Sequence, residues 1–196
     1  METKRIFSIM TIFFICGLLV TVSSPVTASE VFKVDPVHSA ITFRVKHLGI
    51  SFVHGRFNNP TGTITFDEKV PGSSSIKVSV KVADIDTSNA ERDEDLKSKD
   101  FFDAEKYPVI SIYSETFRKV SKDIYEVSCR LTLRGITRPL TVKVRHIGSG
   151  SDPWGGYRAG FETTFLIKRS DFGMTHMLGG VGDKVELTVN IEGIRK

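Results

Sequence analysis

The sequence lacks several patterns on which enzymes and small exported domains commonly depend. It contains two cysteines, Cys16 and Cys129, and neither an HExxH motif nor the Cys/His spacing of a zinc site. A nucleophile elbow, a phosphate-binding loop and a dinucleotide fingerprint are also absent from it. No block of five or six basic residues occurs, which argues against nucleic acid as a partner. We therefore expect no enzymatic activity, no catalytic or metal site and no cofactor.

The first residues have instead the features of a secretory signal peptide. Lys4 and Arg5 precede an apolar run over residues 6–22, and small residues follow as far as Ala28. An uncleaved membrane anchor is the alternative, but the run is slightly short of the roughly 20 apolar residues that a span needs. We expect a signal peptide over 1–28, cleavage after Ala28, and one periplasmic domain over 29–196.

Cleavage at this point would leave one cysteine, Cys129, in the mature chain. The leader carries Glu2, Lys4 and Arg5, so the formal charge would fall from +4 to +3. Cys129 would have no partner for an internal disulfide, and it lies at the same alternation parity as its apolar neighbours. We interpret it as a buried core thiol, so packing alone must stabilise the domain.

Alternation of apolar and polar residues dominates the rest of the chain. In the stretch 38–49, Ile41, Phe43 and Val45 lie at one parity with polar residues between them, which is typical of a strand with one buried face. Residues 48–59 are interpreted as a connection. Similar alternation predicts further strands over 61–66, 76–82, 109–117, 124–133, 140–145, 157–167 and 185–191.

One charged segment, from Ala90 to Lys99, has a helical character instead. Ser88 and Glu91 fit a capping box at its start, and its acidic residues are best explained as a solvated face rather than a metal site. The chain therefore predicts an all-β domain of about eight strands with one short α-helix. Sequential antiparallel hairpins of this kind can form a sandwich or a closed barrel, and closure would remove exposed edges.

Large apolar side chains recur at the inward parity of these strands. A packed core explains any one of them, but in a barrel their sum suits an apolar cavity. His47 and Arg169 continue two inward rows to the strand ends and are candidates for contact with a ligand head group. The alternatives are a structural histidine and a surface arginine paired with Asp171. The candidate lining residues are Phe43, Val45, Phe66, Ile112, Leu131, Leu133, Phe161, Phe165 and Ile167.

Six stretches of the chain together form a recognisable combination: HSAITFRVKHLG (38–49), HGRF (54–57), the block 86–108, LTLRGITRPLTV (131–142), DPWGGYRAGFE (152–162) and KRSDFG (168–173). This combination resembles the YceI-like family, the polyisoprenoid-binding, lipocalin-like periplasmic proteins. The resemblance runs nearly from Val31 to the C-terminus. It implies an extended eight-stranded antiparallel lipocalin-like barrel with a helix, holding an isoprenoid chain such as that of a quinone or a polyprenyl phosphate.

Three functions are therefore consistent with the sequence. The first is a periplasmic carrier of an isoprenoid lipid or quinone, which would also make transient contact with the membrane. The second is a quinone-linked stress or redox protein with weak or unrecognised catalytic activity. The third is an interaction module that uses the charged helix. The sequence does not specify an oligomeric state.

Overall fold

The computed structural model describes residues 29–196, and the expected signal peptide over 1–28 lies outside the described residues. The strands are β1 (Glu30–Val34), β2 (Ala40–His47), β3 (Ser51–Phe57), β4 (Thr61–Phe66), β5 (Ser75–Lys81), β6 (Ile85–Asp86), β7 (Val109–Ser121), β8 (Ile124–Leu133), β9 (Ile136–Ser151), β10 (Tyr157–Lys168) and β11 (Val181–Arg195). The helices are α1 (Ala90–Lys97) and the short 3-10 helices η1 (Pro71–Ser73), η2 (Val82–Asp84) and η3 (Arg169–Phe172).

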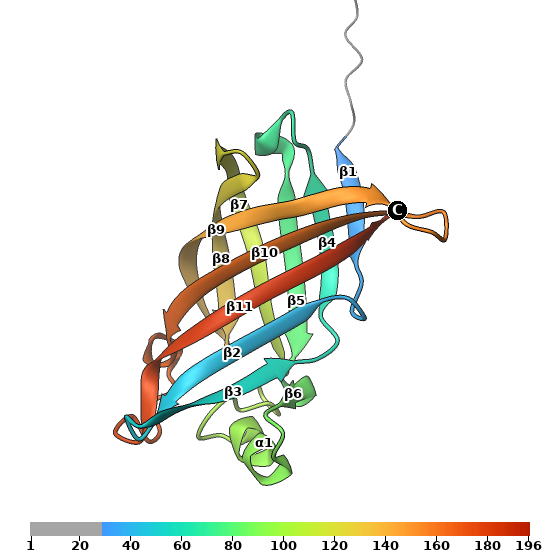
Figure 1. Ribbon diagram of the computed structural model, residues 1–196. Helices are drawn as coiled ribbons and strands as arrows, with labels where there is room; N and C mark the ends of the chain where they lie inside the picture. The colour runs from blue at the N-terminus through green and yellow to red at the C-terminus, as the bar shows by residue number, and fades with distance from the viewer. Residues whose placement is uncertain (1–28) are drawn as a thin grey trace, which may run out of the picture.

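Eight of the strands close into an antiparallel barrel (Figure 1). Their order is β1-β4-β5-β7-β8-β9-β10-β11, and β11 pairs back with β1 through Gly193–Arg195. The structure therefore confirms the predicted eight-stranded, lipocalin-like barrel with one α-helix. Closure provides each of these strands with a neighbour on both sides, which protects their edges from pairing with other chains.

The remaining three strands extend the wall from the N-terminal part of β11. This part pairs with β2, which in turn pairs with β3, and β3 pairs briefly with β6. The prediction that 48–59 is a connection is wrong, because Ser51–Phe57 forms β3. Glycine usually weakens a strand, but here a Cβ on Gly55 would lie only 2.4 Å from Cζ of Phe43, so the missing side chain lets β3 pack closely.

Aromatic rings fill the end of the barrel where β7 turns into β8. The ring of Phe66 lies 5.4 Å from that of Tyr125 and 5.1 Å from that of Phe161, both nearly edge-on. His146 lies 4.7 Å from Phe66 on another side, and burial lowers the pKa of its imidazole. Edge-to-face pairs contribute about 0.5–1.5 kcal/mol each beyond the area that they bury. This end of the barrel is therefore solid.

The helix α1 lies at the opposite end of the barrel (Figure 1). Its N-cap is Asn89, whose side chain accepts a hydrogen bond from the Arg92 amide at 2.9 Å, so the predicted capping box at Ser88 is wrong. Leu96 packs against the core, and the other side chains of the helix are partly or fully exposed. No helix within residues 29–196 combines the length and the apolar character needed to cross a membrane.

Cys129 lies inside the wall of the barrel, as the sequence predicted. Its side chain is buried, and its Sγ donates to the carbonyl oxygen of Leu140 at 3.2 Å. Burial raises the pKa of this thiol to about 11, so the reactive thiolate is scarce at neutral pH.

Candidate functional site

An apolar cavity of about 180 Å³ lies between the aromatic end of the barrel and α1. A single water needs about 10–15 Å³ of such space, so there is room for roughly a dozen water-sized groups. Aliphatic and aromatic side chains form most of the wall. The polar residues in the wall are Ser79, Ser111, Ser114, Glu162, Thr163 and Arg169.

Eight of the nine residues predicted to line a cavity do face it. Side chains point alternately inward and outward along a strand, which is why parity alone located them. The ninth, Phe66, lies outside the cavity wall, within the aromatic end described above. The eight are Phe43, Val45, Ile112, Leu131, Leu133, Phe161, Phe165 and Ile167.

Sequence reasoning did not identify the lining residues that come from outside the alternating strands. Leu96 of α1 and the adjacent Phe101 and Phe102 contribute to the cavity wall at the end opposite the aromatic rings. The ring of Phe102 stands edge-on to that of Phe57, 5.7 Å away. The signal available in the sequence was the presence of large apolar side chains in an otherwise charged segment.

Arg169 follows the last residue of β10, lines the cavity and is buried, with an exposed fraction of 4%. We call the end of the cavity that Arg169 lines its mouth, for its position at the strand ends. Its guanidinium donates to three main-chain carbonyls, those of Met174 at 3.0 Å, Val181 at 2.9 Å and Gly182 at 3.0 Å. Within residues 29–196 it forms no ion pair, so the predicted alternative of a surface pair with Asp171 is wrong. Burial lowers the pKa of Arg169, partly offset by the nearby carboxylate of Asp183.

His47 is not one of the residues that line the cavity. It ends β2, where it is opposite Ser51 in the β2–β3 hairpin and opposite Val181 of β11, and it is only partly buried. Of the two predicted head-group residues, the structure therefore places only Arg169 against the cavity.

The wall of the barrel opens between β9 and β10. The two strands pair only as far as Glu162 and Arg145, although β10 continues to Lys168 and β9 begins at Ile136. Thr163, the first residue beyond this pairing, has a buried Oγ1 with no hydrogen-bond partner among the described residues. The ladder between β9 and β10 is thus interrupted beside the cavity.

An outer groove follows the same opening. Leu131 and Ile167 line both this groove and the cavity, so their side chains separate the two spaces. Arg138 crosses the opening near η3 and donates from Nε to the carbonyl of Asp171 at 3.1 Å. The cavity and the outer groove are therefore adjacent here, between β9 and β10.

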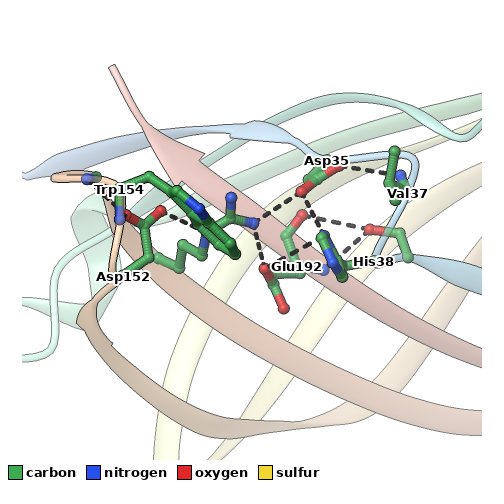
Figure 2. A network of polar contacts seen from close by, with 9 residues as sticks. Asp35, Val37, His38, Asp152, Trp154 and Glu192 are labelled. Atoms are coloured by element: carbon green, nitrogen blue, oxygen red, sulfur yellow. Dashed lines mark hydrogen bonds and ion pairs between the residues drawn. The ribbon is translucent and has the colours of Figure 1, made fainter.

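A polar network near the N-terminal end of β2 is a second candidate site, in this case for a metal ion (Figure 2). The carboxylates of Asp35 and Glu192 lie with His38 in an arrangement that could hold a metal ion. However, the guanidinium of Arg158 already donates to Asp35 at 2.8 Å, to Glu192, and to Asp152 at 2.7 Å. This cation supplies the charge that a metal would supply, so the network ties the ends of β1, β10 and β11 together.

Comparisons with known proteins agree with this architecture. Residues 32–193 match the sequence model of a family described as "YceI-like domain". A "UPF0312 protein" of Pseudomonas aeruginosa is 44% identical over 167 residues, which cover 84% of this chain and 87% of that protein.

Two solved structures share the fold. Burkholderia cenocepacia BcnA aligns with a TM-score of 0.75 at 23% identity, over 81% of this chain and 98% of that one. A polyisoprenoid binding domain from Saccharophagus degradans, implicated in plant cell wall breakdown, aligns with a TM-score of 0.67 at 14% identity. That alignment covers 86% of this chain and 99% of the other.

Proposed function

Since the chain belongs to the YceI-like family, we propose that it binds an isoprenoid lipid, of the quinone or polyprenyl phosphate type, and carries it in the periplasm without catalysing a reaction. The observation that carries this proposal is the apolar cavity inside the barrel, with a buried arginine at its mouth. The polyisoprenoid binding domain with the same fold supports the choice of ligand.

The volume of the cavity limits the length of isoprenoid chain that fits in this conformation of the protein. Room for roughly a dozen water-sized groups corresponds to about two or three five-carbon isoprene units. Moving one unit from water into the cavity is worth roughly 4 kcal/mol, at about 0.8 kcal/mol per carbon. A longer chain would require the wall to widen, and the parts of β9 and β10 that are not paired with each other could separate without breaking ladder hydrogen bonds.

Preference for this protein over a bilayer must come from the head group and the fit. A lipid tail in a membrane is already out of water, so burial of the tail alone gives little net gain. Arg169 provides a distinct interaction, because three of its five N–H donors bind carbonyls and two are left for a ligand oxygen. A quinone carbonyl or a phosphate oxygen could each accept such a bond, and the charge of the arginine favours the phosphate.

The proposal is tested by identifying the lipid that co-purifies with the full chain after expression and export. Mass spectrometry of an organic extract should find an isoprenoid in a defined ratio to protein. Phe165→Ser, in the cavity wall, should reduce this ratio severalfold. Ile147→Ser, on β9, is the matched control and should leave it unchanged, because Ile147 is 57% exposed and lines neither the cavity nor the outer groove. An equal lipid content in both variants, or no isoprenoid in the wild type, would contradict the proposal.

A further inference from the structure

Two loops at the mouth end of the barrel expose a group of large apolar side chains. The β2–β3 hairpin presents Leu48, Ile50 and Phe52, with exposed fractions of 58%, 85% and 51%. The loop between η3 and β11 presents Met177 and Leu178, with exposed fractions of 53% and 41%. We call these five residues the apolar tip.

The two loops form one continuous surface. The amide of Leu48 donates to the carbonyl of Gly180 at 2.7 Å. The side chains of Leu48 and Met177 both reach over Gly180, since Cδ2 of the first and Cε of the second lie 3.5 Å from the position of a Cβ there. Figure 1 shows the β2–β3 hairpin beside the loop that leads into β11, at the lower left.

The backbone of the apolar tip indicates that the fold does not require these residue types. Leu48 has φ of +51° and Met177 has φ of +52°, a left-handed conformation that glycine, asparagine and aspartate tolerate best. Neither side chain is buried, so no packing compensates for this conformation. Within residues 29–196, the other non-glycine residues with positive φ are all polar: Asn59, Ser88, Asp103, Asp123 and Arg134.

Basic side chains stand directly behind the apolar tip. Lys46 is exposed and lies opposite Phe52 in the β2–β3 pairing. The guanidinium of Arg44 lies over the Phe52 ring, 4.8 Å from its centroid, and is paired with the carboxylate of Glu186 at 2.8 Å. Lys46 is therefore the cation that carries the charge argument. Projecting apolar side chains with an exposed lysine behind them match the interface of an anionic bilayer, where the apolar groups meet acyl chains and the ammonium group meets phosphates.

We propose that the apolar tip inserts into the interface of a lipid bilayer that contains anionic lipid, and so holds the mouth of the cavity against the membrane. Val45 precedes the tip on β2 and Val181 follows it on β11, and both line the cavity. Docking in this orientation therefore places the Arg169 end of the cavity at the membrane surface. The proposal goes beyond lipid binding, because it concerns the membrane itself and holds for any cavity ligand.

Flotation of the protein, purified after export, with vesicles of phosphatidylethanolamine and phosphatidylglycerol tests this proposal. The double variant Ile50→Ser/Leu178→Ser should lose at least fivefold in the vesicle-bound fraction. Val37→Ser is the matched control, because Val37 is 81% exposed but lies before the opposite end of β2, and it should bind as the wild type does. Equal binding by the two variants, or no binding by the wild type, would overturn the proposal.

Two further measurements separate the proposal from its competitors. If sedimentation shows that the double variant breaks up a wild-type dimer while vesicle binding is unchanged, the apolar tip contacts a second copy and the membrane proposal is wrong. The isoprenoid content of the same preparations reports on the carrier function independently. Loss of vesicle binding with normal lipid content is the result expected if the tip docks and the cavity is intact.

Discussion

Arg169 binds the carbonyl of Gly182 at 3.0 Å, and this bond joins the segment that follows β10 to the start of β11 at the mouth of the cavity. The Arg169 side chain also donates to the carbonyls of Met174 and Val181. It therefore connects the loop between η3 and β11 to the first residues of β11. The loop also carries two of the five residues of the apolar tip, Met177 and Leu178. Arg169 therefore both stabilises this loop and is the residue that we propose to bind the ligand head group.

Replacing Arg169 with leucine should destabilise the protein by about 3 kcal/mol, because three carbonyls lose a charged donor worth about 1 kcal/mol or more each. Urea unfolding measures the change. Arg138→Leu is the control, since Arg138 is exposed and makes one carbonyl bond, and it should cost less than about 1 kcal/mol. Equal losses in the two variants would show that Arg169 does not have this role.

Thr163→Val should raise the free energy of unfolding by about 1 kcal/mol. The buried hydroxyl of Thr163 has no partner among the described residues, and an unsatisfied buried polar group costs about 1–3 kcal/mol. Thr164→Val is the neighbouring control, because that exposed hydroxyl bonds to Thr188 at 3.0 Å and its loss should not stabilise. A fall in both stability and lipid content in Thr163→Val would instead indicate that the hydroxyl binds the ligand.

Parity in the sequence was sufficient to predict which residues face inward, but not how far along the barrel they lie. Phe43 and Phe165 line the cavity as predicted, whereas Phe66, at the same parity, packs into the solid end. The position of a residue along the barrel axis depends on the register between neighbouring strands, and this register is set by contacts between residues far apart in the sequence. The carbonyl partners of Arg169 were unpredictable for the same reason, since they depend on how a loop folds back.

Gly55→Ala should destabilise the protein by about 1–3 kcal/mol and reduce its lipid content. The added methyl group would lie 2.4 Å from Cζ of Phe43, and overpacking of this size displaces the neighbouring ring, here one that lines the cavity. Gly148→Ala is the control, because nothing lies within 4 Å of the position of its Cβ. Thermal unfolding and lipid extraction of both variants measure the two effects.

The Asp35 network should make stability depend on pH in acid. The hydrogen bond from His38 and that from Arg158 lower the pKa of Asp35 from 3.8 to about 2, although burial opposes this shift. A carboxyl whose pKa is lowered by folding stabilises the protein above the unfolded pKa, and this stabilisation is lost as pH falls from about 4 to about 2. At about 1.4 kcal/mol per pKa unit, the effect is about 2 kcal/mol.

Asp35→Asn tests this expectation through urea unfolding at pH 6, 4 and 2.5. The variant should be less stable than the wild type at pH 6, and the difference should shrink towards pH 2.5 as Asp35 of the wild type becomes protonated. Asp171→Asn, at an exposed position, should show no such trend. A difference that stays constant over this range would mean that the carboxylate charge of Asp35 contributes nothing.

The central claim is that the inward rows of side chains enclose an apolar chain. A crystal structure of the protein purified from its own cells, without added detergent, tests this most directly. Continuous, tubular electron density should extend from the ring of Phe161 to the guanidinium of Arg169, between the side chains of Phe43 and Phe165. An interior in which these side chains meet each other and leave no room for a hydrocarbon chain would contradict it.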